Sequence, residues 1–194
     1  MVETRSTMLS LGTQAPPFRL ADVRTKKPVS LDDLRDAKAL LVAFICNHCP
    51  FVKHVQSGLV ALARDAKARG VAVVGISSND VAEYPQDGPQ AMADEAKRAG
   101  YDFPYLFDET QDVAKAYRAA CTPDFFLFDG KRRLVYRGRM DDARPGNDRP
   151  VTGAELRAAI DALLAGKTIS ADQKSSVGCN IKWKRGSEPD YFAV

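Results

Sequence analysis

The sequence predicts an α/β domain: a central mixed sheet flanked by helices, with an N-terminal strand extension and an irregular C-terminal tail. Two apolar runs that enclose a helical stripe predict a parallel βαβ unit. Two later strand-like runs on either side of Asp129-Gly130 predict an antiparallel hairpin. With 194 residues, 45% of them hydrophobic, the chain is long enough to bury one core.

The first expected elements are short strands. The segment 12–20 is turn-forming and then strand-like, and residues 28–31 form a second strand. Ser30 or Asp32 can then cap a turn of helix. Residues 39–45 are uninterruptedly apolar, which predicts a central strand covered on both faces.

The βαβ unit spans residues 39–77. After its first strand, apolar residues recur at steps of three and four, which predicts an amphipathic helix that Gly70 ends. Residues 71–77 form a second buried strand, parallel to the first through a right-handed crossover. The helical stripe consists of Val52, Val55, Leu59, Leu62 and Ala66.

Shorter elements follow in the second half of the chain. We expect a helix near residues 90–99, a strand over 103–107 and a helix over 112–120. Strands over 125–128 and 133–137 form the hairpin. The sheet therefore begins with parallel strands and ends with antiparallel ones.

The last expected helix covers residues 152–164. Thr152 is its predicted N-cap, and Glu155 completes a capping box. The regular pattern then stops, so we divide the chain into a domain over 1–165 and a tail over 166–194. The tail has few apolar residues, and we expect it to lie over the domain surface.

Charge and composition exclude some partners. The 28 basic residues, against 25 acidic ones, are scattered and do not form the basic stripe of a nucleic-acid-binding protein. The most apolar stretch is too short to cross a bilayer, so no membrane partner is expected. The first ten residues lack the apolar run of a secretory signal, which predicts a cytoplasmic protein.

Cys46-Asn47-His48-Cys49 joins the end of a buried strand to the start of a helix. This spacing lets two sulfurs form and reopen a small-loop disulfide, and a helix N-terminus favours the reactive thiolate. In a cytosolic chain, such a pair indicates redox chemistry or metal binding. Two buried structural cysteines are the alternative.

Pro50 indicates which cysteine attacks. Proline is best tolerated in the first helical turn, which places Cys49 at the N-cap and Cys46 in the loop before it. On that geometry Cys49 is the nucleophile with the lower pKa, and Cys46 is the resolving cysteine. A helix that starts at Cys46 is the alternative.

These features resemble the thioredoxin-like superfamily, in particular its peroxiredoxin-like (alkyl hydroperoxide reductase/thiol-specific antioxidant, or redoxin) branch, over residues 12–164. The resemblance implies a thioredoxin-like fold and places the attacking cysteine, counted from Phe44, at Cys49. The motifs that carry it are residues 12–18, the strand that leads into Cys46–Pro50, Cys121-Thr122-Pro123 before residues 125–130, and the closing helix.

The resemblance also implies that Thr122 and Pro123 face the dithiol. They match the threonine–cis-proline pair of thioredoxins, where a cis bond would present backbone for pairing with a substrate chain. A proline at the start of a strand is the plainer alternative.

Three departures from the family bear on activity. Val42 and Cys46 stand where peroxiredoxins have a proline and a hydroxyl residue, and Thr122-Pro123 stands where their catalytic arginine would be. Efficient peroxidase activity is therefore in doubt. Ala43 replaces the buried acid of thioredoxins, so the sequence shows no side-chain proton acceptor for Cys46.

Three further residues are candidate auxiliaries. His48 could lower the pKa of a neighbouring thiol, or it could be a solvated loop residue. Cys121 could exchange with the dithiol, although a small residue at this junction is more often simply buried. Cys179 could act as the C-terminal resolving cysteine that peroxiredoxins often use, or be a packed thiol. His54, one turn along the helix, is expected to be exposed.

A metal site is the competing interpretation of Cys46, His48, Cys49 and His54. Zinc needs four ligands, and three of these residues crowd one short loop at an unusual spacing. Covalent haem needs a histidine after Cys49, where Pro50 stands. We therefore expect no metal and no bound cofactor.

The sequence thus predicts an enzyme, a thiol–disulfide oxidoreductase that exchanges disulfides through Cys49 and Cys46. Its expected partners are protein or small-molecule disulfides and thiols, with a cellular dithiol as reductant. A thiol peroxidase that reduces hydroperoxides through Cys49 is the first alternative. A non-enzymatic redox sensor or binding module is the second. Substrate and oligomeric state stay open.

Overall fold

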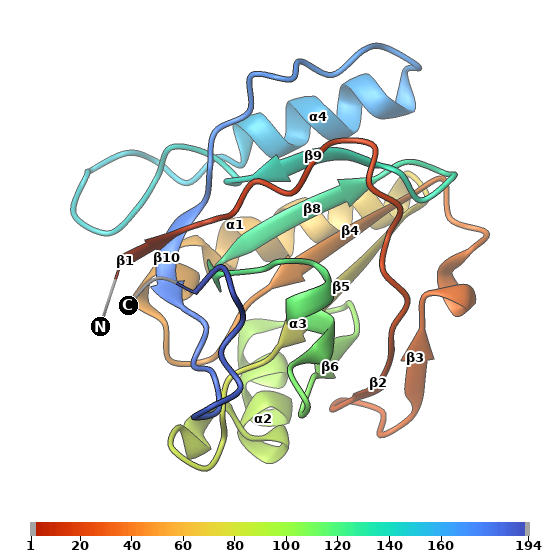
Figure 1. Cartoon of the computed structure of the whole chain (residues 1–194). Coiled ribbons are helices and arrows are strands. Elements are labelled where there is room, and N and C mark those ends of the chain that lie inside the picture. Colours follow the sequence, from red (N-terminus) through yellow and green to blue (C-terminus); the bar gives the residue numbers. More distant parts are fainter. Residues whose placement is uncertain (1–2, 193–194) are drawn as a thin grey trace.

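The computed structural model describes residues 3–192 and has a mixed seven-stranded sheet at its centre (Figure 1). The strand order is β3-β2-β6-β5-β4-β8-β9. The three middle strands β4, β5 and β6 are parallel, and β8 and β9 continue the sheet antiparallel, as expected. The bounds are β2 (Arg19–Asp22), β3 (Pro28–Ser30), β4 (Ala39–Phe44), β5 (Val71–Ser77), β6 (Tyr105–Phe107), β8 (Asp124–Phe128) and β9 (Leu134–Gly138).

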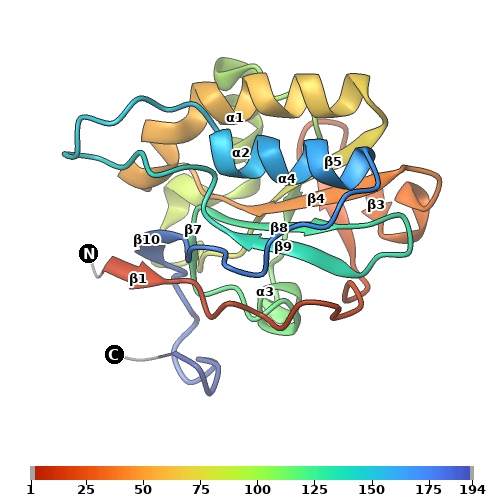
Figure 2. The same cartoon turned by 90° about the horizontal axis from the view of Figure 1, so that it is seen from above.

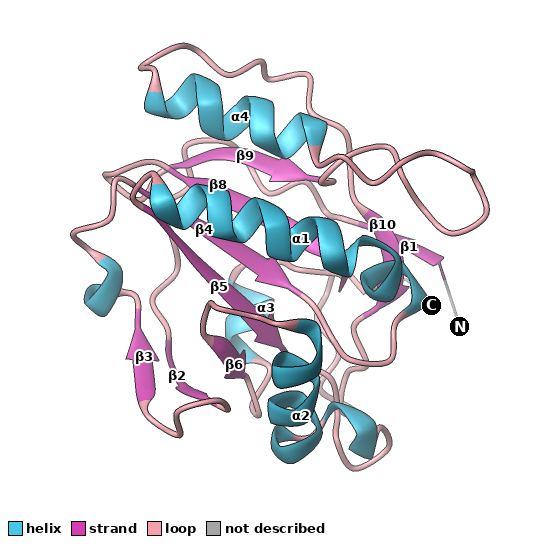
Figure 3. Cartoon of the chain, turned by 180° about the vertical axis from the view of Figure 1, so that it is seen from behind, coloured by secondary structure: helices cyan, strands magenta, loops and turns pink. Residues whose placement is uncertain are grey.

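Helices cover both faces of this sheet, as the turned views show (Figures 2 and 3). Three of them, α1, α2 and α4, lie on one face, and the short α3 lies on the other. Every residue of β4 is buried, because the strand is covered from both sides. The bounds are α1 (Pro50–Ala68), α2 (Pro89–Ala99), α3 (Asp112–Ala116) and α4 (Ala154–Leu164), with 3-10 turns over Asp32–Leu34 and Pro85–Asp87.

Alternation along β4 divides the core into two parts. Leu41 and Ala43 pack in a cluster with the apolar stripe of α1, whereas Val42 and Phe44 pack in a second cluster with α3. This is the period-two pattern of a strand that both faces bury. The strand thereby fixes the position of the loop that follows it, which carries the Cys-x-x-Cys motif.

A separate three-stranded sheet lies at one end of the molecule, and its order is β1-β10-β7. Its strands are β1 (Glu3–Arg5), β7 (Cys121–Thr122) and β10 (Val177–Asn180), all antiparallel. Figures 1 and 2 show β1 and β10 side by side although they come from opposite ends of the chain. The sequence did not predict β1.

The C-terminal tail differs from the expectation. It is irregular over most of its length, but it contributes β10, and it does not merely cover the surface. Cys179, Ile181 and Trp183 are buried, the last two within the core cluster on the α3 side of the sheet. These residues, together with the partly buried Ile169, Tyr191 and Phe192, anchor the tail to the core.

Two helix predictions need correction. The helix expected over 112–120 ends at Ala116, because Arg118 adopts the left-handed region with φ 51° and the chain then turns into β7. The last helix begins at Ala154, not at Thr152, and its N-cap is Gly153 with φ 67°.

The predicted capping box at this helix is also wrong. The carboxylate of Asp141 accepts the hydrogen bonds from the backbone N–H groups of Thr152 and Gly153, at 2.8 and 2.5 Å. Glu155 instead forms a bidentate pair with Arg139. A distant carboxylate thus accepts the hydrogen bond from the Thr152 N–H that the capping box had assigned to Glu155.

Within residues 3–192, none of the helices combines the length and the hydropathy needed to cross a bilayer.

Candidate active site

Cys49 is the N-cap of α1, as Pro50 predicted. Its backbone is extended, with φ −71° and ψ 123°, and Pro50 is the first helical residue. Cys46, Asn47 and His48 lie in the loop between β4 and this helix. The alternative helix start at Cys46 is excluded. Cys49 therefore lies at the positive end of the helix dipole, where a thiolate is stabilised.

The Thr122–Pro123 peptide bond is cis, as expected from the resemblance, and it faces both cysteines. The Sγ atom of Cys46 lies 3.3 Å from the hydroxyl oxygen of Thr122. The Sγ atom of Cys49 lies 3.2 Å from the carbonyl oxygen of Thr122. The structure thus brings together the four residues that the sequence predicted as the catalytic set.

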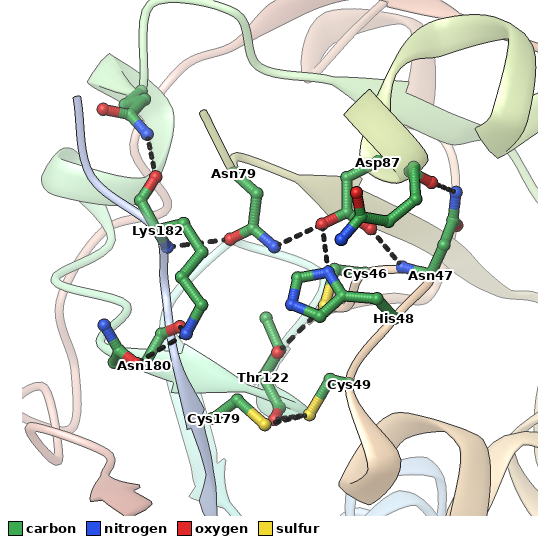
Figure 4. A network of polar contacts seen from close by, with 12 residues as sticks. Cys46, Asn47, His48, Cys49, Asn79, Asp87, Thr122, Cys179, Asn180 and Lys182 are labelled. Carbon is green, nitrogen blue, oxygen red and sulfur yellow. Dashed lines mark hydrogen bonds and ion pairs between the residues drawn. The ribbon is translucent and has the colours of Figure 1, made fainter. Parts of the chain in front are cut away.

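Cys179 joins this group from the tail. Its Sγ atom is 2.8 Å from that of Cys49, and in the sheet pairing it lies opposite Thr122 (Figure 4). All three thiols are buried: Cys49 is 0% exposed, Cys179 1% and Cys46 3%. The tail thus reaches the site, which the first interpretation of Cys179, as a C-terminal resolving cysteine, requires.

The two thiols of the motif differ in acidity. Hydrogen bonds from the Cys179 and Cys46 thiols and from the backbone N–H of Val52 hold the pKa of Cys49 far below its usual range, against the effect of burial. The hydrogen bond to Cys49, burial and the Asp87 carboxylate raise the pKa of Cys46. These surroundings therefore favour a thiolate at Cys49 and a protonated thiol at Cys46.

Asp87 is the residue that the sequence analysis missed. It is 0% exposed, yet it lies at the end of the loop after β5, and its carboxylate oxygen is within 4.8 Å of the Cys46 sulfur and the His48 nitrogen. Its Oδ1 accepts from the backbone N–H of Asn47 at 2.8 Å, and its Oδ2 accepts from Asn79 Nδ2 at 2.7 Å. A side-chain proton acceptor therefore lies beside Cys46, contrary to the expectation drawn from Ala43.

One signal could have pointed to Asp87. The carboxyl ends of parallel neighbouring strands meet at one edge of a sheet, which is where sites of this architecture form. β5 is parallel to β4, so the polar loop that follows β5 belongs beside the loop that follows β4. That argument would have placed the loop but not chosen Asp87 among its polar residues.

His48 is held in place rather than solvated. Its Nδ1–H donates to Asp87 Oδ2 at 2.6 Å, and its ring stacks on Tyr84 with the centroids 5.3 Å apart. The side chain is 20% exposed, so the His48–Asp87 pair connects the interior of the site with solvent. A pocket of about 360 Å³ opens on this side, lined in part by His48, Lys53 and Glu95.

Two other sequence candidates lie apart from this chemistry. Cys121 is buried, its thiol donates to the carbonyl of Pro123 at 3.8 Å, and burial raises its pKa. His54 is half-buried rather than exposed, and its Nε2 atom is enclosed by protein without a hydrogen-bond partner.

The residues that could bind a metal ion differ from those that the sequence suggested. Among the described residues, the atoms close enough to share an ion belong to Cys46, His48 and Asp87, and not to Cys49 or His54. Both carboxylate oxygens of Asp87 already accept hydrogen bonds from neighbouring groups. An ion bound here would displace at least one of them.

Comparison with known proteins gives one family and a consistent fold. A structure from Geobacillus kaustophilus, described as an uncharacterized conserved protein, is 54% identical to this chain, covers 96% of it and 98% of its own length, and has a TM-score of 0.94. The thioredoxin domain of a thiol-disulfide oxidoreductase from Bacteroides vulgatus has a TM-score of 0.59 at 19% identity, covering 78% and 99%. A peroxidoxin from Mycobacterium tuberculosis has a TM-score of 0.60 at 19% identity, covering 81% and 98%. A search of curated proteins finds no match.

The two distant structures show only that the thioredoxin-like fold is shared, whereas a match to a family model identifies the family. The family model for AhpC/TSA proteins matches residues 11–137, well over half of the chain. This membership supports oxidoreductase chemistry in general. The matched region includes the Cys46–Cys49 motif and the Thr122–Pro123 pair but not Cys179. The chain belongs to the AhpC/TSA (redoxin) family of thioredoxin-like proteins.

Proposed function

We propose that the protein is a thiol–disulfide oxidoreductase in which Cys49 attacks a disulfide and Cys46 resolves the product. One observation carries this proposal: Cys49 caps α1, where its surroundings lower its pKa, and the neighbouring Cys46 lies where its surroundings raise its pKa. A pair in which one sulfur is ionised and the other protonated is the state that disulfide exchange requires before the first step.

The reaction has two balanced steps. The Cys49 thiolate attacks one sulfur of a substrate disulfide, forms a mixed disulfide with it and releases the other substrate sulfur as a thiolate. Cys46 then loses its proton and attacks Cys49 Sγ, which releases the second substrate thiolate and leaves a Cys46–Cys49 disulfide. A cellular dithiol, which we place in the cytoplasm, is oxidised as it returns the pair to thiols.

Asp87 takes the proton of Cys46 in the second step. Its carboxylate oxygen lies within 4.8 Å of that sulfur, and His48 connects it with the solvent-facing pocket. Thr122 contributes by position: its hydroxyl lies 3.3 Å from Cys46 Sγ, where it can donate to the thiolate that forms. The hydroxyl lowers the pKa of Cys46, against the larger effects that raise it.

A thiol peroxidase is the second candidate, and the burial of Cys49 favours it. A sulfur with 0% exposure is easier to reach for a small hydroperoxide than for a protein disulfide. In this reaction Cys49 takes one peroxide oxygen to become a sulfenic acid, releasing an alcohol or water. The Cys46 thiol then condenses with this sulfenic acid, and one water leaves as the Cys46–Cys49 disulfide forms.

The two candidates are separated by parallel rate measurements. The reduced protein is mixed with hydrogen peroxide or with a small aromatic disulfide, and loss of the Cys49 thiolate is followed by rapid quenching with an alkylating agent. We expect fast reaction with the disulfide and a peroxide rate no better than that of an ordinary thiolate. The opposite ranking would replace the first proposal with the second.

Substituted proteins test the order of the two cysteines. In a protein that also carries Cys179→Ser, Cys46→Ser should accumulate a stable mixed disulfide on Cys49, whereas Cys49→Ser should form none. Cys121→Ser serves as the control for the loss of a buried thiol elsewhere in the fold. If neither oxidant reacts and no mixed disulfide accumulates, a non-enzymatic redox module becomes the better account.

A further inference from the structure

Strand β10 of the tail occupies the place that a substrate chain would take. It pairs antiparallel with β7, so that Cys179 lies opposite Thr122 and Asn180 lies opposite Cys121. β7 is the segment directly before the cis Thr122–Pro123 bond, whose free backbone was expected to pair with substrate. In this structure the protein's own tail uses that backbone.

Gly178 allows β10 to pack closely against the cis Thr122–Pro123 bond. A Cβ atom at position 178 would lie 2.0 Å from the carbonyl oxygen of Thr122 and 3.2 Å from the nitrogen of Pro123. Any larger residue would therefore push the strand away from the cis peptide bond. The next residue in the chain is Cys179, so the close approach of Gly178 delivers the sulfur to Cys49.

The tail also forms hydrogen bonds on the side of the site where Asp87 lies. The backbone N–H of Lys182 donates to Asn79 Oδ1 at 2.9 Å, and the amide group of the same Asn79 donates to Asp87 (Figure 4). The carbonyl of Lys182 accepts from the backbone N–H of Asp80 and from Gln111 Nε2, both at 2.8 Å. One short segment thus contacts both the attacking sulfur and the residues around the proton acceptor.

We propose that β10 is a built-in substrate strand and that Cys179 is a third redox-active cysteine, which exchanges with the Cys46–Cys49 disulfide. This inference rests on the proposed function, because that reaction supplies the disulfide. The Cys179 sulfur, after losing its proton, attacks Cys49 Sγ. The Cys46–Cys49 bond breaks, a Cys49–Cys179 bond forms, and Cys46 takes up a proton. No external oxidant is consumed, since one disulfide replaces another.

The exchange gives the oxidised protein two forms. With a Cys46–Cys49 disulfide, only noncovalent contacts hold the tail, among them the hydrogen bonds that join Lys182 to Asn79 and Gln111. With a Cys49–Cys179 disulfide, the tail is covalently fixed over the site and Cys46 is a thiol again. Since Cys49 is 0% exposed beneath β10, a protein disulfide reaches it only after the strand has left β7.

Peptide mapping of the oxidised protein tests the proposal without any substitution. The reduced protein is treated with a small aromatic disulfide, quenched in acid, alkylated and digested with trypsin. Cleavage after lysine and arginine puts Cys46 and Cys49 together in peptide 39–53, Cys179 in peptide 175–182 and Cys121 in peptide 119–131. We expect a cross-linked pair of peptides 39–53 and 175–182 beside the internally bridged peptide 39–53.

Three variants define what the experiment can distinguish. Cys46→Ser should convert almost all oxidised protein into the 39–53/175–182 pair, since Cys179 is then the remaining neighbour of Cys49. Cys179→Ser should give only the internally bridged peptide. Cys121→Ser should give the wild-type pattern.

The outcomes separate the two proposals. If wild-type protein yields only the internal bridge, and Cys46→Ser keeps the small thiol on Cys49, the role of Cys179 is refuted while disulfide exchange stands. If Cys179→Ser forms no internal bridge, the proposed function itself fails. A cross-link between peptide 175–182 and peptide 119–131 would also refute the assignment, because it would place the tail elsewhere.

Discussion

At the scale of single residues, the two motif cysteines have different surroundings and therefore different roles, although they lie only three positions apart in the chain. Cys49 receives hydrogen bonds from two thiols and from the first turn of α1, whereas Cys46 faces a carboxylate and a hydroxyl. The first environment favours a thiolate that attacks. The second keeps a proton until the resolving step, when Asp87 is there to receive it.

The role of Asp87 predicts a selective defect. Asp87→Asn removes the carboxylate but keeps a side chain of similar shape, so Cys46 loses its proton acceptor. With a chromogenic aromatic disulfide, release of the first thiolate reports attack by Cys49, and release of the second reports resolution by Cys46. We expect the second phase to slow about 100-fold, at the lower end of the usual contribution of general base catalysis, while the first phase changes little.

Dependence on pH distinguishes proton transfer from mere support of the loop. In Asp87→Asn the second phase should increase steadily with pH, because only solvent hydroxide can then deprotonate Cys46, whose pKa is raised. Asp94→Asn is the matched control, since Asp94 lines the same pocket and bonds Gln90 rather than Asp87. Equal slowing of both phases, without a new pH dependence, would mean that Asp87 only shapes the loop.

The acidity of Cys49 should depend on a hydrogen-bond donor at position 179. Cys179→Ala removes the donor and should raise the pKa of Cys49, whereas Cys179→Ser retains an O–H group and should raise it less. Ultraviolet thiolate absorbance, recorded against pH, measures this pKa directly. If the pKa of Cys49 is the same in both variants as in the wild-type protein, the helix terminus and not Cys179 sets that pKa.

Asp124 predicts a dependence of stability on pH. Burial raises the pKa of this fully enclosed carboxyl group, so the folded state binds its proton more tightly than the unfolded chain does. The free energy of unfolding should therefore fall as pH rises from about 4, the pKa of an unfolded aspartate, through the raised pKa of the folded protein.

Asp124→Asn should remove the contribution of Asp124 to this fall and stabilise the protein at neutral pH. The asparagine can still accept the 3.1 Å hydrogen bond from the backbone N–H of Phe125. Denaturant unfolding from about pH 4 to about pH 8 measures the effect. Asp108→Asn is the contrasting control: its Oδ2 accepts from Ser78 and Ala114, so an amide group there should destabilise the protein. A parallel fall in both wild type and Asp124→Asn would contradict the assignment.

At the scale of elements, strand β10 can pair closely with β7 only because position 178 is a glycine. Gly178→Ala places a methyl group against the Thr122 carbonyl, and we expect a loss of about 3 kcal/mol of unfolding free energy, in the range of overpacked sites. Because the strand must shift, alkylation of Cys49 should also become faster. Thermal unfolding and timed alkylation measure the two effects.

Gly186→Ala is the matched control in the same tail. Gly186 has φ 75° with open space around it, so an alanine there costs only about 1 kcal/mol of left-handed strain. The alkylation rate of Cys49 should not change. If Gly178→Ala behaves like Gly186→Ala, β10 is not closely seated on Thr122.

Local patterns and distant contacts explain which elements the sequence could predict. The strand before Cys46 and helix α1 were predictable because their apolar periods are long and Pro50 marks the helix start. The predicted capping box at Thr152 is wrong because the carboxylate of Asp141, eleven residues earlier, accepts the hydrogen bond from the Thr152 N–H. Strand β10 was missed because Val177–Asn180 has no period of its own and becomes a strand only between β1 and β7.

At the scale of the whole molecule, both ends of the chain meet over the active site. β1 pairs with β10 on the side opposite β7, with Glu3 opposite Cys179 and Arg5 opposite Val177. The backbone of Ser6 continues the pairing by donating to the carbonyl of Ser176 at 3.0 Å. The strand that carries Cys179 is therefore an inner strand, and the N-terminal segment protects its outer edge.

Deletion of residues 1–6 should loosen this arrangement. The loss of the β1 hydrogen bonds should lower the unfolding free energy by about 2 kcal/mol and expose β10 to exchange with solvent. Thermal unfolding measures the stability, and amide hydrogen exchange in peptide 175–182 measures the opening. Ser6→Ala is the milder control, since it keeps the backbone pairing and removes the hydrogen bonds of the serine hydroxyl with Ser176 N and with the Met8 sulfur. Unchanged exchange in the deleted protein would show that β7 alone holds the strand.

The position of β10 in chain order also governs how the protein is made. A polypeptide is synthesised from its N-terminus, and a domain generally folds as a unit. Strand β4, helix α1 and the Thr122–Pro123 segment are all synthesised before residues 177–180, so the segments that carry the dithiol leave the ribosome before the strand that covers them. During translation the two motif thiols therefore pass through a stage in which β10 is not yet there to enclose them.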